Sequence, residues 1–455
     1  MPKLKFIEGE EHRYYEFSTL KWFPEATNHR GLAKGGIYLL SGPPGCGKTT
    51  LALQMMVDFA FRGEKVLYVT LEQSPSFLKA TILDRIFPYR RSIFSSIKKK
   101  EKGNDWRKQL ENIGKTLSEE EAMKHIEKRI EENMFIDSSV NSMDNLPDFL
   151  IRQVMSSGAQ YKDIKIMVVD SLQGLGTAPT SSRPYRSLYE FNRYAKDEGI
   201  TCLLIGHVTK SEKIAGPRSL EHNVDCVLYM RRAMKLRPLF VPKNRYGPER
   251  HEPFCLIMNK WGCLEKSKHM SARASVAYGY LPGTNRLTEV QTLVKLPKFG
   301  VRPGILAPYL PRQKLRQIIG VISSIKDVDV SDLTFEINCY LPGGSFYSHI
   351  LDFPLAMSIL SSYFQLPLPP YSVFIGELDL SRKVRPISDE SFFQNFLNSL
   401  TEVNTFLQIK NIFISSFQVE LLKHFLSQKN LNIKVIGVAD LEELIYEIWP
   451  EIGSL

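Results

Sequence analysis

The feature that most constrains the fold of this chain is the nonapeptide GPPGCGKTT at residues 42–50. It has the spacing G-x-x-x-x-G-K-[ST], and it stands between an apolar run at residues 37–40 and a helix-forming run at residues 50–60. Glycine lets the backbone turn so that successive N–H groups point inward, and the start of a helix adds the positive end of its dipole. We therefore predict a strand, a phosphate-binding loop and a helix here.

Polar residues in and beyond this loop predict how a nucleotide would be held. Lys48 would place a positive charge on the β and γ phosphates, and the Thr49 hydroxyl would ligate Mg²⁺. Asp170 closes an apolar run at residues 164–170, where a Walker B carboxylate holds the Mg²⁺ shell. A site for ATP and Mg²⁺ is predicted. Its nucleotide-binding residues are Gly42, Pro43, Pro44, Gly45, Cys46, Gly47, Lys48, Thr49, Thr50 and Asp170, of which Thr49 and Asp170 serve the metal.

Glu72 lies just past another apolar run, at residues 65–70. A carboxylate there could orient and deprotonate the water that attacks ATP. It could instead be an acidic residue at the start of a helix, where the helix dipole stabilises it. The residues themselves leave both interpretations open.

Five short apolar runs predict the architecture around the loop. They are bounded by Gly, Asp or Ser and lie at residues 37–40, 65–70, 164–170, 201–206 and 226–230. Runs of this length are typical of buried strands, and the intervals between them leave room for crossover helices. An α/β fold with a mostly parallel sheet is therefore expected.

The 455 residues are too many for one compact core, and the pattern of apolar runs and helical segments changes near residues 262–272. Residues 1–30 show no periodicity and are expected to be a lead-in. An ATPase domain is predicted at residues 31–262 and a separate α+β domain at residues 270–455. In the second domain, helices are expected at residues 353–364, 418–426 and 440–448, and strands at residues 372–378, 411–415 and 434–437.

A densely charged stretch interrupts the first domain at about residues 90–132. Its mixed charge signs predict a solvated surface insertion, helical in its second half. A basic arm that touches DNA is the alternative.

Composition narrows the classes of partner and site. The formal net charge of +10 favours a polyanionic partner, nucleic acid above all. The six cysteines include no C-x-x-C pair, so no zinc site is predicted. No apolar run approaches the roughly 20 residues of a membrane helix, and the N-terminus lacks an apolar signal core. A cytoplasmic protein without a membrane partner is expected.

The first domain resembles the RecA/KaiC-type ATPase core in residues 35–54, in LYVTLEQS and in VVDSLQ. More specifically, LLIGHVTKSEKIAGPRSLEHNVDCVLYM at residues 203–230 and KNRYG at residues 243–247 resemble the bacterial RadA/Sms family. Members of that family are branch-migration factors of homologous recombination, in which a RecA-like motor is joined to a Lon-protease-like domain. The resemblance covers roughly residues 30–455 apart from the charged insertion.

The resemblance implies roles for residues that would face DNA. His207, Thr209 and Lys210 match a strand end and loop that couple the state of the γ-phosphate to DNA contact. The loop IAGPR at residues 214–218, which ends in Arg218, matches a segment that lines a central DNA channel.

The resemblance also implies catalytic roles. Glu72 matches the catalytic glutamate. Lys243 and Arg245 match a pair that reaches the nucleotide of a neighbouring subunit, where it would act in trans as arginine fingers do. Lys243 is counted with the DNA-coupling residues as well.

The segment at residues 341–388 resembles the Lon protease fold. Active Lon proteases use a serine and lysine dyad, but here Leu355 stands at the position of the nucleophile and Ser391 at that of the lysine. A leucine cannot be acylated, and the nearby Ser358 is not an obvious substitute. The domain is predicted to be proteolytically inactive, a scaffold for ring assembly and duplex DNA, with Lys383 and Arg385 as candidate phosphate contacts.

Two functions are compatible with these features. The first is a ring-shaped motor, expected to be hexameric, that acts on single-stranded and branched DNA with a recombinase of the RecA type. The second is a KaiC-like ATPase switch or assembly scaffold that does not translocate on DNA. IAGPR and KNRYG favour the motor. RadA proteins usually begin with a four-cysteine zinc finger, and its absence from residues 1–30, like the charged insertion, favours the switch.

Overall fold

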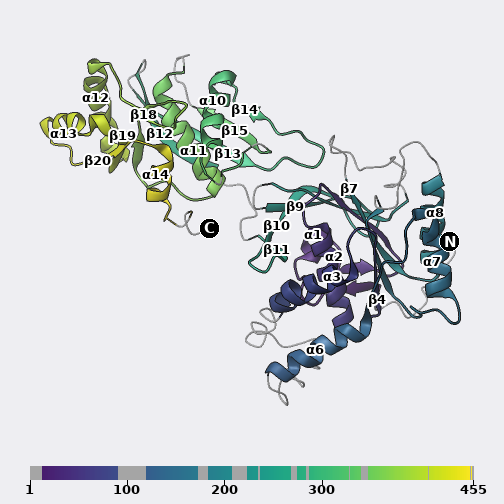
Figure 1. Cartoon of the computed structure of the whole chain (residues 1–455). Coiled ribbons are helices and arrows are strands. Elements are labelled where there is room, and N and C mark those ends of the chain that lie inside the picture. The colour runs from purple at the N-terminus through teal and green to yellow at the C-terminus, as the bar shows by residue number, and fades with distance from the viewer. Residues whose placement is uncertain are drawn as a thin grey trace, which may run out of the picture. The chain divides into compact units, whose positions relative to one another are not determined.

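The computed structural model describes residues 13–90, 119–172, 183–207, 223–233, 236–267, 274–282, 286–326, 328–330, 332–339, 347–407, 409–450 and 452. The chain divides into two compact units, Met1–Lys268 and His269–Leu455 (Figure 1).

A nine-stranded sheet forms the centre of the first unit. Its order is β11-β10-β9-β8-β3-β7-β6-β4-β5. The strands from β8 to β5 are parallel, and β9, β10 and β11 are added antiparallel. The mostly parallel α/β sheet expected from the apolar runs is confirmed. The strands are β3 (Ile37–Gly42), β4 (Val66–Thr70), β5 (Met134–Asp137), β6 (Ile166–Asp170), β7 (Thr201–His207), β8 (Cys226–Met230), β9 (Leu236–Asn244), β10 (Arg250–Met258) and β11 (Leu264–Lys266).

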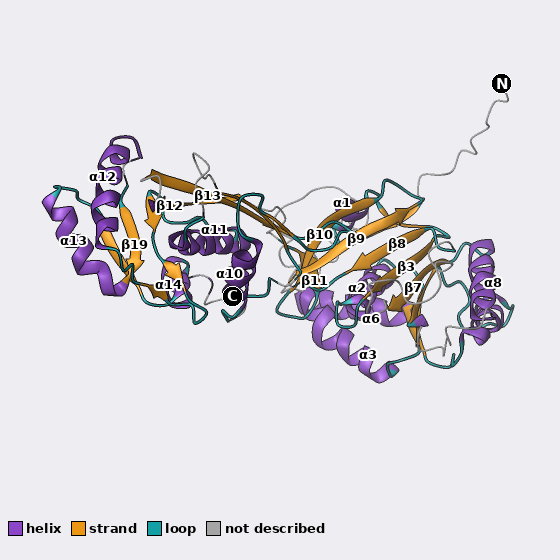
Figure 2. Cartoon of the chain, turned by 90° about the horizontal axis from the view of Figure 1, so that it is seen from above, coloured by secondary structure: helices purple, strands orange, loops and turns teal. Residues whose placement is uncertain are grey.

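Helices cover both faces of this sheet. One face is covered by α2 (Lys48–Phe61), α3 (Pro75–Thr81) and α6 (Glu119–Asn133), and the other by α7 (Leu146–Leu150) and α8 (Arg183–Asp197) (Figures 1 and 2). Every residue of β3, β4, β6 and β8 is buried, which is why these strands are continuous apolar runs in the sequence. The helix α6 is the one expected in the second half of the charged stretch, and residues 91–118 lie outside the described residues. A 3-10 helix at Met143–Asn145 precedes α7, and short π-helices at Ile151–Met155 and Ile82–Ile86 follow α7 and α3 respectively.

Residues 13–30, which we expected to be a lead-in, pack as part of this unit. The strand β1 (Tyr14–Glu16) pairs with β2 (Gly31–Ala33), and α1 (Phe23–Thr27) lies between them in sequence. The buried carboxylate of Asp58 in α2 accepts hydrogen bonds from the backbone N–H groups and hydroxyls of Ser18 and Thr19. These are contacts between distant segments, so no local periodicity reveals them. At the other end, the pairing of β11 with β10 carries the unit beyond residue 262.

The second unit has a seven-stranded mixed sheet in the order β14-β15-β13-β12-β16-β19-β20. The strands β12, β13 and β15 are antiparallel neighbours, and the other pairings are parallel. One core joins Phe393 and Phe396 of α12 to Ile412 of β19. The strands are β12 (Ala274–Leu281), β13 (Arg286–Lys295), β14 (Ile305–Leu306), β15 (Thr334–Cys339), β16 (Ser372–Phe374), β19 (Asn411–Ser415) and β20 (Lys434–Val438). The helices are α10 (Arg312–Ser323), α11 (Asp352–Phe364), α12 (Glu390–Leu407), α13 (Val419–Gln428) and α14 (Leu441–Ile448), with short 3-10 turns at His349–Leu351 and Ser416–Gln418.

The single strand predicted at residues 372–378 is wrong, because the chain changes sheets within it. After β16, the chain turns at Gly376, and β17 (Glu377–Leu378) pairs with β18 (Val384–Arg385) in a separate two-stranded sheet. Gly376 has a φ of 153°, and a Cβ there would lie 2.6 Å from Val384 Cγ1. A tight packing contact of this kind leaves no trace in an apolar run.

All six cysteines are buried and free. Burial raises the pKa of each thiol, so the cysteines are protonated at neutral pH and poorly nucleophilic. Across the described ranges, none of the helices combines the length and apolarity needed to span a bilayer.

Candidate nucleotide-binding site

The phosphate-binding loop lies at the carboxyl edge of the parallel sheet, where the parallel strands end. It follows β3 and leads into α2, which begins at Lys48. Gly42 has a φ of 153°, and a Cβ there would lie 2.2 Å from the Met230 carbonyl oxygen. Gly47 caps α2 in the left-handed region, with a φ of 103°. Both positions require glycine. The resulting turn brings the backbone of the loop to the start of α2, where helix N–H groups can bind phosphate.

Lys48 is buried, and its ammonium is held by the loop itself. Its Nζ donates to the carbonyl oxygens of Gly42 at 2.9 Å and Pro43 at 3.1 Å. Burial lowers the pKa of Lys48, while Cys46 and Asp170 nearby raise it. The side chain is therefore folded against carbonyl groups that phosphate oxygens could replace.

Asp170 and Thr49 meet although they come from distant parts of the sequence. The Thr49 hydroxyl donates to Asp170 Oδ2 at 2.8 Å. Asp170 is the last residue of β6 and lies level with Thr70 of β4. Burial raises the pKa of Asp170, and the hydrogen bonds from Tyr68 and Thr49 lower it. A hydroxyl and a carboxylate side by side are hard oxygen donors of the kind that Mg²⁺ prefers.

Glu72 lies beside the residue that follows Asp170. The Ser171 hydroxyl donates to Glu72 Oε1. The helix α3 has Ser74 as its N-cap, whose side chain accepts from the Phe77 N–H. Glu72 thus precedes the capping residue and is held by Ser171, a neighbour of Asp170. This placement favours a role at the nucleotide site over a role in stabilising α3.

The KNRYG segment lies away from the loop, toward the amino edge of the parallel strands. Lys243 of β9 pairs with Val227 of β8, which pairs with Leu39 of β3. The loop begins at Gly42, further along β3 toward the carboxyl edge. With about 3.3 Å per residue and about 4.8 Å between strands, Lys243 and Gly42 are roughly 14 Å apart. A lysine side chain cannot cover that distance to a nucleotide that lies beyond the carboxyl edge.

Arg245 is tied to its own chain by Asp225. Its Nη1 lies 2.9 Å from Asp225 Oδ1, and Lys196 Nζ lies 2.8 Å from the same oxygen. Asp225 Oδ2 accepts from the Ile37 N–H at 3.0 Å. Burial raises the pKa of Asp225, but the bonds from Lys196 and Ile37 outweigh it and hold that pKa below its usual value. A charged carboxylate therefore fixes the KNRYG turn to the amino end of β3.

Several predicted residues lie outside the description or only partly within it. The backbone of His207 ends β7 and pairs with Gly42, so the strand end predicted to couple to DNA adjoins the loop. Thr209, Lys210 and the loop at residues 214–218 with Arg218 lie outside the described residues.

In the second unit, the position of the Lon nucleophile and the nearby serine are both buried. Leu355 is buried in α11. Ser358 is buried too, and its hydroxyl donates to the carbonyl oxygens of Ser275 and Val290. Ser391 is exposed, and its backbone N–H and its hydroxyl both donate to Oδ1 of Asp389, the residue that precedes α12. Arg385 pairs with Asp379 at 3.4 Å.

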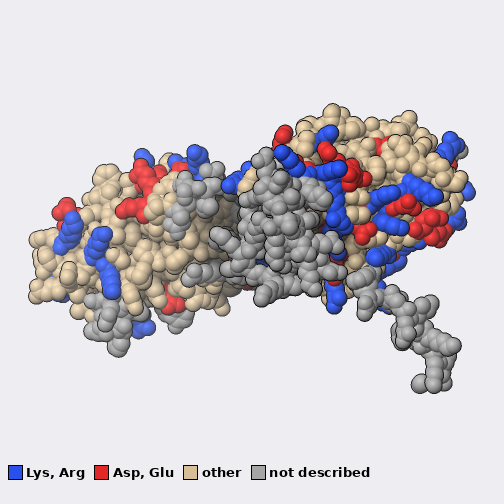
Figure 3. Space-filling view, turned by 90° about the horizontal axis from the view of Figure 1, so that it is seen from below, with Lys and Arg blue, Asp and Glu red and all other residues tan. Residues whose placement is uncertain are grey.

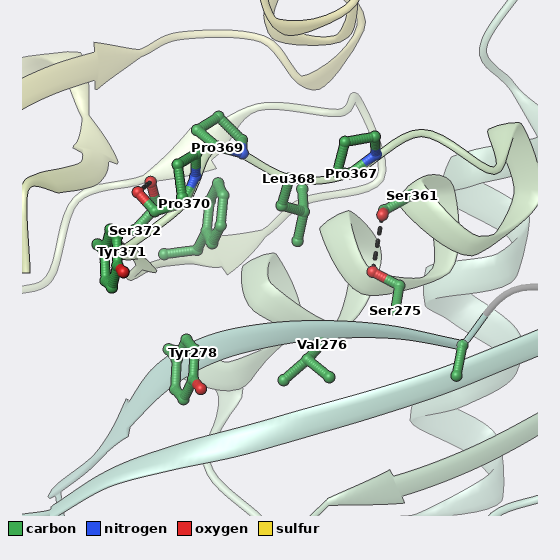
Figure 4. Close-up of a pocket in the computed structure, with 12 residues that line it drawn as sticks. Ser275, Val276, Tyr278, Ser361, Pro367, Leu368, Pro369, Pro370, Tyr371 and Ser372 are labelled. Carbon is green, nitrogen blue, oxygen red and sulfur yellow. Dashed lines mark hydrogen bonds between the residues drawn. The ribbon is translucent and has the colours of Figure 1, made fainter. Parts of the chain in front are cut away.

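One pocket of this unit, of about 270 Å³, lies between β12 and the segment before β16 (Figure 4). The Ser275 hydroxyl donates to Ser361 Oγ at 2.7 Å inside it. The described residues around it carry no charged side chain, so they provide no base to activate either serine. They are Ala274, Ser275, Val276, Tyr278, Ser361, Pro367, Leu368, Pro369, Pro370, Tyr371, Ser372 and Phe374.

Sequence reasoning missed Tyr68 and Ser171 at the nucleotide site, and Asp225 beside the KNRYG turn. Ser171 follows Asp170 directly, and its place after a strand that ends in a predicted metal ligand was a usable signal. Tyr68 looked like one more apolar strand residue. Asp225 precedes β8 and offered no motif.

Comparisons with known proteins agree on the first unit. The family model described as ATPase: KaiC matches residues 19–260. DNA repair protein RadA of Helicobacter pylori is 28% identical over 400 residues, which cover 84% of this chain and 77% of that protein. RadA of Chlamydia trachomatis is 28% identical over 441 residues, or 91% and 81% of the two chains. RadA of Bacillus subtilis is 28% identical over 380 residues, or 79% and 70%.

Two solved structures are similar at low TM-scores. A KaiC-like protein of Pyrococcus horikoshii is 19% identical with a TM-score of 0.39, and the match covers 56% of this chain and 99% of that one. A DnaB-like replicative helicase is 13% identical with a TM-score of 0.38, and the match covers 52% and 59%. The span of the family model contains the phosphate-binding loop, Glu72, Asp170 and KNRYG.

Proposed function

This chain belongs to the KaiC ATPase family and is a divergent RadA-like protein, and on that premise we propose that it is a DNA-dependent ATPase that works as a ring-shaped branch-migration motor. Its work would be homologous recombination and DNA repair in the cytoplasm. The observation that carries the proposal is the separation of Lys243 and Arg245 from their own phosphate-binding loop.

The residues at the carboxyl edge fit ATP and Mg²⁺. The bound metal–nucleotide supplies an electrophilic γ-phosphoryl group. Lys48 would exchange the carbonyl oxygens of Gly42 and Pro43 for phosphate oxygens. Thr49 and Asp170 would hold the metal, and Glu72 would accept the proton of the attacking water.

The position of the KNRYG segment supports a role in trans. Charge develops on the γ-phosphoryl oxygens during hydrolysis, and a cation placed there stabilises it. Lys243 and Arg245 cannot provide that cation to their own loop, but in a ring each subunit can present them to the next. Turnover would then depend on assembly, here proposed to be a hexamer.

The DNA-facing part of the proposal is supported by charge and by relatives. The net charge is +10, and Figure 3 shows Lys and Arg side chains on the first unit, interspersed with Asp and Glu. The relatives are named DNA repair proteins. We propose single-stranded and branched DNA as substrates and a RecA-type recombinase as partner. Lys210, Arg218 and Lys243 would contact or couple to DNA.

We propose that the second unit is a Lon-like scaffold without peptidase activity, which helps assemble the ring and binds duplex DNA. Buried Leu355 and buried Ser358 support the loss of the nucleophile. Exposed Lys383 and Arg385 remain its candidate phosphate contacts.

A KaiC-like switch that hydrolyses ATP without moving on DNA is the second candidate, and the family model named for KaiC favours it.

The effect of DNA on the rate of ATP turnover distinguishes the motor from the switch. We expect single-stranded DNA to raise ATP turnover severalfold, because a motor couples ATP hydrolysis to its movement along DNA. Phosphate release is measured with single-stranded DNA, blunt duplex DNA and heparin, the last controlling for any polyanion. Turnover that is the same in all conditions would favour the switch. A synthetic three-strand recombination intermediate then tests branch migration directly.

A second prediction concerns Glu72. In Glu72→Gln, nucleotide binding is expected to stay within about twofold of the wild type, while turnover falls roughly 10²–10⁴-fold through loss of the general base. Glu64→Gln is the matched control, since Glu64 precedes β4 at the opposite edge of the sheet. If Glu72 only stabilised α3, the variant would keep its turnover and lose no more than about 1 kcal/mol of unfolding free energy.

A further inference from the structure

Tyr68 is a buried tyrosine at the nucleotide site to which the mechanism above gives no task. It lies in the middle of β4 and is fully buried. Its hydroxyl donates to Asp170 Oδ2 at 2.6 Å. The Thr49 hydroxyl donates to the same oxygen at 2.8 Å. Two hydroxyls from different elements thus converge on one oxygen of the carboxylate.

The strand register explains why Tyr68 can reach Asp170. Tyr68 of β4 is level with Val168 of the parallel neighbour β6. Side chains two residues apart on a strand share a face, so Tyr68, Val168 and Asp170 lie on the same face of the sheet. The tyrosine ring spans the remaining step toward the carboxyl edge. A shorter hydroxyl side chain at the same position would not cover that step.

The two oxygens of the Asp170 carboxylate have different hydrogen-bonding surroundings. In the described part of the chain, the side-chain hydrogen bonds to Asp170 end on Oδ2. The terminal torsion of an aspartate is broad and turns easily unless neighbours hold it. Tyr68 anchors Oδ2 from the sheet, and Oδ1 would then be available to a bound metal ion.

We infer that Tyr68 is a positioning residue that orients the Asp170 carboxylate for the metal–nucleotide complex. This inference rests on the ATP and Mg²⁺ site proposed above. Thr49 would ligate the metal when the complex binds, whereas Tyr68 lies within β4 and would keep its hydrogen bond to Asp170. Partners of metal ligands commonly set metal affinity in this way.

The contrasting interpretation is that Tyr68 only satisfies its own buried hydroxyl. The chain contains a matched pair that separates the two interpretations. The Tyr161 hydroxyl donates to Asp137 Oδ2 at 2.6 Å, and Tyr161 is also buried. Asp137 ends β5 of the same sheet, yet it is not a predicted metal ligand. Tyr161→Phe therefore controls for the loss of a buried tyrosine–aspartate bond.

The test uses the full chain and measures metal affinity rather than activity alone. Mn²⁺ binding to the complex with a non-hydrolysable ATP analogue is followed by electron paramagnetic resonance in wild type, Y68F and Y161F. We expect Mn²⁺ affinity to fall about tenfold or more in Y68F and to stay within about twofold in Y161F. Binding of a fluorescent nucleotide in EDTA should be unchanged in both. Excess Mg²⁺ should restore part of the turnover of Y68F.

A double-mutant cycle with Asp170→Asn gives a second measurement. If Tyr68 acts through Asp170, Y68F should cause no further loss of Mn²⁺ affinity in the D170N background. Equal Mn²⁺ affinity in Y68F and wild type, or an undiminished effect of Y68F in D170N, overturns the inference. A wild-type chain that binds neither nucleotide nor Mn²⁺ instead overturns the proposed function. Thermal melting confirms that each variant is folded.

Discussion

Replacing Lys48 with alanine is expected to abolish ATP turnover and to weaken nucleotide binding roughly 100-fold or more. The ammonium is the buried cation of the phosphate-binding loop, held by the carbonyl oxygens of Gly42 and Pro43. A nucleotide would take over those hydrogen bonds with its phosphate oxygens. Alanine supplies neither the charge nor the donors. Turnover is measured by phosphate release and binding by titration with a fluorescent ATP analogue.

Lys65→Ala is the matched control for this variant. Lys65 is partly exposed and pairs with Asp163 at 3.8 Å, an interaction that contributes little to stability. It should turn over ATP as the wild type does. Because Lys48 is buried, the melting temperature of K48A has to be compared with that of the wild type before its turnover is interpreted. A folded K48A that retained more than a tenth of wild-type turnover would contradict the assignment of the loop.

The Lys243→Ala variant is expected to bind nucleotide and to assemble as the wild type does, yet to lose turnover by roughly 10³-fold or more. Its loop, Asp170 and Glu72 remain intact, and turnover measured without DNA reports on the cation offered to the neighbour. Lys243 is preferred to Arg245 for this test, because Arg245 is bonded to Asp225 and its removal would also loosen the turn. Assembly is followed by light scattering and turnover by phosphate release.

Mixing two inactive variants separates a trans role from a cis role. K48A has a defective loop and an intact Lys243, while K243A has the reverse. In a mixed ring, a K243A subunit can receive Lys243 from a K48A neighbour, so mixtures should regain part of the wild-type turnover. No gain in any mixing ratio, with mixed assembly confirmed, would show that Lys243 does not act across subunits.

The elements that could be predicted were those encoded by contiguous residues. Buried parallel strands are apolar on both faces, so β3, β6 and β8 stood out as runs, and β8 was predicted at its observed bounds. The strand expected at residues 372–378 failed because Gly376 redirects the chain through a contact with Val384. The packing of residues 13–30 was not predicted for a related reason. Ser18 and Thr19 donate hydrogen bonds to Asp58, which lies about 40 residues further along the chain.

Local chemistry was enough to identify the phosphate-binding loop, because the spacing of its glycines, Lys48 and Thr49 sets the direction of neighbouring N–H groups along one short stretch of chain. The surroundings of Asp170 are a matter of tertiary register. Tyr68 is 102 residues from Asp170 and Thr49 is 121, and they meet it only because β4 and α2 pack beside β6. The same register separates Lys243 from the loop of its own chain. The sequence thus indicated a nucleotide site. The register of the sheet is the reason we expect a neighbouring subunit to supply the cation that this site lacks.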